Sequence, residues 1–323
     1  MEQIFANVFA TLLIDCRQQM IPMVNEVHGS NYTGEDEVVL SHEEHYLKNN
    51  EELEKRISDS HFSVKRKDEL ERYHFECQTK QDASMPKRMA EYELPIALEH
   101  SEVEGNEVEV EFPKAAVLQL QNSRNMPDEY KIRIKTSEGI AVHKVRIMKL
   151  NHYSVRDIFE KGLYLLIPYH ILVYKKRFIE YNKDEGKLAK LLKVYEEILA
   201  RLEEAMEKGR IDGHAVYTII LMSRRIIEHV TAGYDRIRER LGEIMGGVVL
   251  DNPARAIFAN GKNVGKAEGK IEGKIEGKIE GKIEGRIEGK IEAYISLLRD
   301  GIISMAEAAK RLGMNEEEVQ QYL

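Results

Sequence analysis

The stretch Tyr73-His74-Phe75-Glu76-Cys77-Gln78-Thr79-Lys80 decides how this chain is interpreted. Side chains of a β-strand alternate between two faces, so the stretch predicts one mostly apolar face and one polar face. The polar face carries an acid, an amide and a cation, which are Glu76, Gln78 and Lys80. This pattern is typical either of the solvated face of a hairpin or of a site that holds a metal ion.

Residues 57–64 also have the composition of a strand, and the charged residues 65–69 suit a turn. We therefore expect an antiparallel hairpin that brings Asp59 close to Glu76. Two neighbouring carboxylates repel each other unless a cation lies between them. The usual occupant is a hard divalent ion with oxygen ligands, such as Mg²⁺.

Several ordered segments carry a resemblance to a known family. They are Met20 to Gly29, Lys55 to Ser60, Arg72 to Gln78, Arg88 to Tyr92, Ile96 to His100, Phe159 to Leu163 and Leu166 to Tyr169. Together they resemble the recombination-promoting nucleases of the PD-(D/E)XK superfamily, which are also described as PD-(D/E)XK family transposases. The resemblance covers residues 1–180 and implies an α/β fold, with a restriction-endonuclease-like mixed sheet flanked by helices.

The same resemblance implies a metal-dependent DNA endonuclease that hydrolyses phosphodiester bonds in recombination or in mobile elements. Asp59 and Glu76 would bind Mg²⁺ or Mn²⁺, and Glu26, on the helix before the hairpin, would be the additional acid beside the metal. Gln78 departs from the family pattern, which expects a Lys there. An amide can orient a water molecule but supplies no charge and no titratable proton. Lys80 is expected to substitute in part.

Arg88 and Tyr92 are four residues apart and are therefore neighbours on one helical face directly after the hairpin. The resemblance implies that Arg88 contacts the DNA phosphate near the metal. A surface arginine beside a packed tyrosine would give the same pattern, so both interpretations stay open.

Composition limits the partners of this chain. The 323 residues are 42% hydrophobic and 32% charged, with a net charge of -8, which excludes indiscriminate binding to nucleic acid but not a local basic surface. DNA as a partner predicts a patchy distribution of charge over the surface, whereas a surface of mixed charges is the alternative.

We find no apolar run long enough to span a membrane and no export signal, and we interpret Cys16 and Cys77 as reduced core residues. We therefore expect a cytoplasmic location.

The periodicity of apolar residues predicts the remaining elements. We expect a helix over residues 4–13, an edge strand over 103–110, further strands over 115–120, 131–135 and 142–148, and a helix capped by Ser154. Beyond residue 182, apolar residues spaced four and three apart, as in a coiled coil, predict one helix, and residues 214–245 predict a second. This helical hairpin would pack on the nuclease-like region or on a second copy of the chain.

The sequence thus divides into a nuclease-like domain (1–180), a helical hairpin region (181–260), a repeat (261–292) and a small helix-turn-helix-like segment (293–323). The repeat is mostly Gly-Lys-Ile-Glu. Its isoleucine row shifts about 40° around a helix at each copy, which makes a stable isolated helix unfavourable. We interpret it as a spacer or as a segment that self-associates. The last segment opens its second helix with three Glu, so a protein contact competes with DNA recognition there.

Two functions remain in competition. The first is the Mg²⁺-dependent endonuclease; the second is a DNA-binding or assembly module that keeps the fold but cuts weakly or not at all, and uses its helical tail to join copies or partners. Gln78 favours the second. The chain lacks a Gly-rich phosphate loop, a Gly-x-Ser-x-Gly, a His-Glu-x-x-His and a paired Cys-x-x-Cys, which excludes the common kinase, serine-hydrolase, metalloprotease and zinc-ribbon classes.

Overall fold

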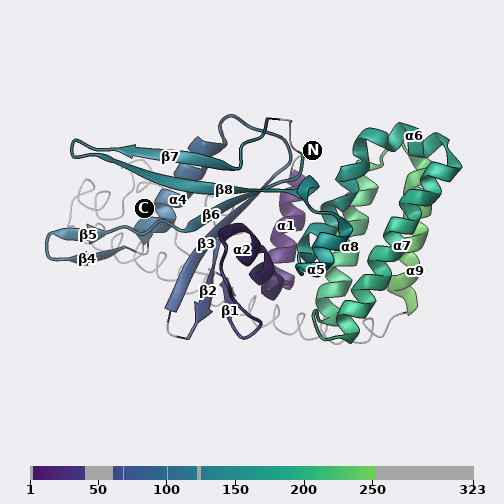
Figure 1. Cartoon of the computed structure of the whole chain (residues 1–323), viewed down its shortest axis with the longest axis horizontal. Coiled ribbons are helices and arrows are strands. Elements are labelled where there is room, and N and C mark those ends of the chain that lie inside the picture. Colours follow the sequence, from purple (N-terminus) through teal and green to yellow (C-terminus); the bar gives the residue numbers. More distant parts are fainter. Residues whose placement is uncertain (1–2, 41–60, 68, 100, 122–124, 252–323) are drawn as a thin grey trace, which may run out of the picture. The chain divides into compact units, whose positions relative to one another are not determined.

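The computed structural model contains a mixed six-stranded sheet with a group of helices beside it (Figure 1). The structure describes residues 3–40, 61–67, 69–99, 101–121 and 125–251, all within one unit that spans residues 1–258. In spatial order the strands are β1 (Glu37–Leu40), β2 (His61–Arg66), β3 (Glu69–Gln78), β6 (Lys114–Gln119), β8 (Ile140–Lys149) and β7 (Glu129–Lys135). β3, β6 and β8 are parallel, and the outer pairs are antiparallel.

The predicted hairpin is confirmed as β2 and β3. Its turn is shorter than expected, because Arg66 already pairs with Glu69. Lys67 has a positive φ of 55°, as tight hairpin turns require. Asp59 precedes β2 by two residues in the sequence and lies outside the described residues, as do the repeat and the C-terminal segment.

Alternation along β3 sends its side chains into two different environments. Tyr73, Phe75 and Cys77 belong to the main hydrophobic core, which also contains residues of α1 (Gln3–Asp15) and α2 (Met20–His28). The opposite face of the sheet is covered by α4 (Met85–Glu99), whose Met85 and Met89 pack on Ala115, Val117 and Val145. His74, Glu76 and Gln78 therefore face α4.

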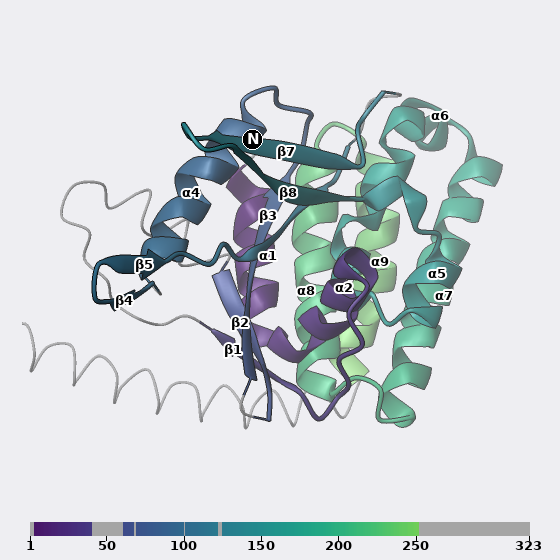
Figure 2. The same cartoon turned by 60° about the vertical axis from the view of Figure 1, so that its left-hand side comes forward.

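The helical part begins with α5 (Val155–Glu160), capped by Ser154 as predicted, and a 3₁₀ segment, η3 (Tyr164–Arg177). It continues through α6 (Phe178–Lys183), α7 (Glu185–Glu207), α8 (Gly213–Val230) and α9 (Asp235–Asp251). The prediction of one helix over 214–245 is wrong. The chain breaks after Val230, and Gly233 adopts φ +87°, a conformation that favours glycine. Figure 2 shows α7, α8 and α9 side by side next to the sheet.

One hydrophobic core continues from the sheet into these helices. It crosses residue 180, where the sequence analysis places the boundary between the nuclease-like domain and the helical hairpin region. Buried residues of α1, η3, α7 and α8 belong to the same apolar cluster. Tyr169 of η3 also donates a hydrogen bond to the carbonyl oxygen of Phe5 in α1 (3.1 Å). The helices therefore pack against the sheet region. Among the described helices, none is long and apolar enough to cross a membrane.

Residues 103–110 form a small hairpin where a single strand was expected. Among the described strands, β4 (Glu102–Glu104) and β5 (Glu107–Glu109) pair only with each other, and Gly105 has φ +60° in the turn between them. Glu102 lies opposite Glu109, and Glu104 lies opposite Glu107. Like charges opposite each other destabilise a strand pair, and the pattern of alternating acid and valine does not reveal the turn.

An ion pair fixes the loop between α2 and β1 to the end of the hairpin. Arg66 donates to both carboxylate oxygens of Asp36 (3.0 and 3.1 Å) and to the side chain and backbone of Asn31. Its guanidinium also lies 4.5 Å from the ring centre of Tyr32. The hydrogen bond from Arg66, aided by the backbone N–H of Thr33, lowers the pKa of Asp36 to about 2.

The substitution Asp36→Asn tests this ion pair through its pH dependence. Because the pKa of Asp36 is lower in the folded chain than the ordinary value of 3.8, the pair stabilises the fold above about pH 4. This stabilisation is lost as the pH falls from about 4 to about 2. We expect the variant to be less stable than the natural chain at pH 6 in urea denaturation, with a difference that shrinks on acidification. A difference that stays constant from pH 6 to pH 2 would contradict this assignment.

Candidate functional site

Arg88 contacts three side chains that carry oxygen atoms, and it does so at the carboxyl ends of the parallel strands β3 and β6. Its Nη2 lies 2.9 Å from Glu76 Oε1, and its Nη1 lies 3.5 Å from both Gln78 Oε1 and Asp82 Oδ2. Only the contact with Glu76 has the length of a strong ionic hydrogen bond. The carboxyl ends of parallel strands are where open α/β sheets commonly bind ligands.

The start of α4 places Arg88 at this position. Asp82 Oδ1 accepts hydrogen bonds from the backbone N–H and the hydroxyl of Ser84 (2.8 and 2.7 Å), which fixes the turn before the helix. The N–H of Arg88 donates to the carbonyl oxygen of Ser84 (3.0 Å), so Arg88 lies in the first turn. The hydrogen bonds from Ser84 and the charge of Arg88 lower the pKa of Asp82.

Tyr92 supports Arg88 from within the same helix, as their spacing predicts. Arg88 Nε lies 3.4 Å from the hydroxyl of Tyr92, and the guanidinium lies 5.8 Å from the ring centre. Burial alone would lower the pKa of Arg88, but the hydrogen bond with Tyr92 and the charges of Glu76 and Asp82 outweigh it and raise that pKa. The Arg88 side chain is 27% exposed. It is therefore a partly buried cation that solvent can still reach.

The sequence analysis did not single out Gln119, which lies beside Gln78 in the register of β6 and β3. Gln119 Nε2 donates to the carbonyl oxygens of Thr79 and Gln121 (3.2 and 2.7 Å). Its Oε1 is buried without a hydrogen-bond partner in the described part of the chain. A buried oxygen of this kind commonly has a partner, such as a water molecule or an ion. A Gln at the end of a buried strand was the available sequence signal.

The structure leaves Glu26 away from this site. Glu26 Oε1 lies 2.6 Å from Lys161 Nζ and accepts a hydrogen bond from Tyr153 (3.1 Å). Its helix, α2, packs on the other face of the sheet, where the ring of His28 contacts Tyr73 and Phe75. The described contacts of Glu26 are thus with Lys161 and Tyr153, while those of Glu76 are with Arg88, and the role of Glu26 beside a metal stays a prediction.

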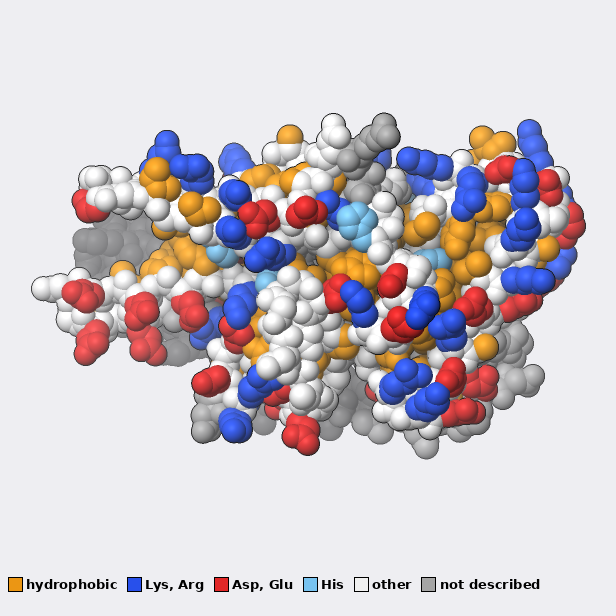
Figure 3. Space-filling view, viewed as in Figure 1, with side chains coloured by type: hydrophobic (Ala, Val, Ile, Leu, Met, Phe, Trp, Pro, Cys, Tyr) orange, Lys and Arg blue, Asp and Glu red, His pale blue; other side chains and the backbone are white. Residues whose placement is uncertain are grey.

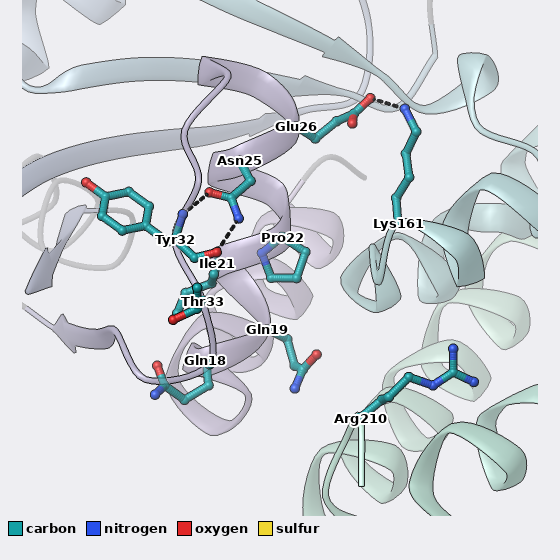
Figure 4. Close-up of a pocket in the computed structure, with 11 residues that line it drawn as sticks. Gln18, Gln19, Ile21, Pro22, Asn25, Glu26, Tyr32, Thr33, Lys161 and Arg210 are labelled. Carbon is teal, nitrogen blue, oxygen red and sulfur yellow. Dashed lines mark hydrogen bonds and ion pairs between the residues drawn. The ribbon is translucent and has the colours of Figure 1, made fainter. Parts of the chain in front are cut away.

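Glu26 instead lines a cavity of about 570 Å³ between α2, the loop that follows it, and the helical region (Figure 4). In the close-up, Lys161 points toward Glu26, and Arg210, which also lines the cavity, lies below Lys161. The amide of Asn25 is occupied by the backbone of Tyr32, with which it makes two hydrogen bonds. The charge of Glu26 is thus balanced by Lys161 within the chain.

Gln78, Lys80 and the two cysteines, which the sequence analysis also named, differ from one another in burial. Gln78 is buried next to Glu76 as expected, whereas Lys80 follows the end of β3 and is exposed, with no ion pair to a described residue. Both cysteines are buried and unpaired, in line with core residues. Burial raises the pKa of the Cys16 thiol to about 12 and also raises that of Cys77, so neither thiol is a nucleophile near neutral pH.

The described residues fit part of a magnesium site. Glu76, Gln78 and Gln119 offer only oxygen ligands, the type that Mg²⁺ prefers. However, one oxygen of Glu76 is already bound by Arg88. Within the described ranges, no group of three His, Cys, Asp or Glu side chains could hold a metal ion. A complete carboxylate pair would need Asp59, which lies outside those ranges.

Comparisons of this chain with protein-family models, with curated proteins and with solved structures find no match. The function proposed below therefore depends on the geometry of this chain's own residues and on the sequence resemblance described above.

A buried carboxylate, Glu93 of α4, lies behind the site and joins β3 to β8. Glu93 Oε1 is 3.6 Å from His74 Nδ1, and its Oε2 contacts His143 Nε2. The side chains of Glu93 and His74 are fully buried. The ring of His74 also packs edge-on against Tyr92, the residue that supports Arg88. Glu93 therefore connects the inner face of the sheet to the helix that carries Arg88.

We expect Glu93→Ala to lower the free energy of unfolding by about 2 to 4 kcal/mol, because it leaves a cavity in the interior and removes the partner of the buried His74. Glu91→Ala, on the exposed side of the same helix, is the matched control and should change stability by about 0.5 kcal/mol or less. Urea denaturation followed by circular dichroism measures both. Equal stability of the two variants would show that the Glu93 contacts contribute nothing.

Proposed function

We propose that this chain is a metal-dependent DNA endonuclease of the PD-(D/E)XK type, with Glu76, Gln78 and Arg88 at its active site and a restriction-endonuclease-like fold. The observation that carries the proposal is the convergence of these three side chains at the carboxyl end of β3. The sequence resemblance supplies the reaction, and the partly exposed guanidinium supplies a reason for phosphate to bind at this place.

Arg88 binds and orients the scissile phosphate in this proposal. A guanidinium can donate two parallel hydrogen bonds to phosphate oxygens, and it keeps its charge at every physiological pH. The weak contacts of Nη1 with Gln78 and Asp82, both at 3.5 Å, would be exchanged for phosphate oxygens. Tyr92 holds the Nε edge, so the side chain needs little rearrangement.

Gln78 orients the attacking water through its amide oxygen, while Glu76 and Asp59 would hold Mg²⁺ or Mn²⁺. When bound, such an ion neutralises charge on the phosphate and promotes ionisation of a water molecule. Because Gln78 cannot take up a proton, the proton of the water must pass to solvent or to the phosphate. Lys80 is exposed next to this edge of the sheet and adds positive charge for the DNA strand.

One observation favours a second function, a DNA-binding or assembly module of the same fold that does not cut. Glu76 is already paired with Arg88, and within the described residues no lysine contacts it. A carboxylate neutralised in this way attracts a metal ion less strongly. The two functions differ in catalysis and share the fold and the affinity for DNA.

Nicking of supercoiled plasmid separates the two functions. With Mg²⁺ or Mn²⁺ we expect the full chain to produce nicked and linear DNA, and we expect Asp59→Ala and Glu76→Ala each to abolish cutting. Glu91→Gln removes an exposed acid of α4 and should leave cutting unchanged. Retention of DNA without cutting would support the second function. Cutting that survives both alanine substitutions would assign the activity to a contaminant.

Arg88→Ala should reduce kcat about 10²- to 10³-fold, because it removes donors aimed at the phosphate in the transition state. Arg88→Lys should recover only part of this loss, since an ammonium cannot form two parallel hydrogen bonds. Single-turnover cleavage at saturating DNA measures the effect on chemistry. An Arg88→Ala variant that cuts at the natural rate would exclude Arg88 from the site.

A further inference from the structure

The outer face of the two-stranded ribbon β7–β8 carries a dense group of cations at the edge of the sheet. We call this group the basic ribbon. Its members are Lys131, Arg133, Lys135, Lys144 and Arg146. Tyr130, Ile132 and Val145 point to α4 and pack there, so the residues that alternate with them share the opposite face. The basic ribbon therefore lies on the face of the sheet away from Glu76.

All five side chains of the basic ribbon are exposed. Figure 3 shows Lys and Arg side chains gathered over β7 and β8. One acid, Glu129, lies among them, at 3.4 Å from Lys131 and from Lys144 and at 3.5 Å from Arg146. Five positive charges and one negative charge leave a local excess of four, in a chain whose total charge is -8.

Two of the five cations of the basic ribbon have no ionic partner in the described part of the chain, and the other three share Glu129. Arg133 and Lys135 form no ion pair with any described residue, and Lys131 lies directly opposite Lys144 across the two strands. Directly opposed like charges weaken a strand pair. This arrangement opposes folding, and an external polyanion would turn it into favourable contacts.

The spacing of the cations indicates the kind of polyanion. Alternate residues of a strand lie about 7 Å apart, so Lys131, Arg133 and Lys135 form a straight row of regularly spaced charges. Beside them, Ile140 and Val142 are 50% and 48% exposed on the same face. A row of cations with neighbouring apolar side chains matches the phosphates and sugars of a nucleic-acid strand. A two-stranded ribbon also has the width of a DNA major groove.

We propose that the basic ribbon binds the backbone of a nucleic-acid duplex. This surface is separate from the proposed cleavage site, and its binding needs neither Glu76 nor a metal ion. Specific bases are not required, because the contacts are to phosphates. The ribbon would hold the duplex against the sheet edge while the rest of the chain acts on it or on a partner.

Fluorescence anisotropy with a labelled 20-base-pair DNA duplex in EDTA tests the proposal on the full chain. The double variant Arg133→Gln, Lys135→Gln should bind about 10-fold more weakly, and the slope of log Kd against log salt should fall by about two. The matched control is Lys190→Gln, Lys193→Gln, which makes the same change in net charge on the exposed side of α7. It should bind like the natural chain.

Glu129→Gln provides a test of opposite sign, because it removes the one acid within the basic ribbon and should tighten binding. Circular dichroism spectra identical to that of the natural chain establish that each variant is folded. Equal losses of DNA affinity in the ribbon variant and in the α7 variant would overturn the proposal. Competition by poly-glutamate as strong as that by unlabelled DNA would also overturn it and would indicate an acidic protein partner. Binding in EDTA that persists while plasmid nicking fails would support the ribbon and refute the nuclease.

Discussion

The alternation of side chains along β3 is the constraint on which the rest of the described chain depends. β3 pairs with β2 along one edge and with β6 along the other, and its two faces are covered by the main core and by α4. One face completes the main core with Phe75, and the other presents Glu76 and Gln78 to α4. A shift of one residue would exchange the two sets and bury Glu76 and Gln78 in the apolar core. The register and the candidate site are therefore specified together.

Much of the fold could be predicted from the sequence where a local pattern coincides with the tertiary environment. The β2–β3 hairpin, the buried strand β6 and the cap of Ser154 follow from alternation, an apolar run and a capping box. The break before Gly233 could not be predicted, because amphipathic periodicity continues through it. The β4–β5 turn was missed for a similar reason, since alternating acid and valine predicts a strand whichever way the chain runs.

The candidate site also contains residues that a local sequence pattern predicts and residues that it does not. Glu76, Gln78 and Arg88 could be predicted because they lie close in sequence, on a strand and on the helix that directly follows it. The contacts of Glu26 could not be predicted, since they are with residues more than a hundred positions away, Tyr153 and Lys161. The positions of Gln119 and Glu93 could not be predicted, because they depend on strand pairing and on burial against distant residues, which a local sequence pattern does not indicate.

The β4–β5 hairpin has a consequence for handling the protein. Within the described ranges its strands pair only with each other, and the side chains from Glu102 to Glu109 are exposed. The connection from α4 to β6 therefore contains a segment whose length does not influence the parallel pairing of β3 and β6. Exposed loop tips of this kind tolerate insertions. The Gly105 turn thus offers a place for a fluorophore or an affinity handle, which would report on the chain without disturbing either face of the sheet.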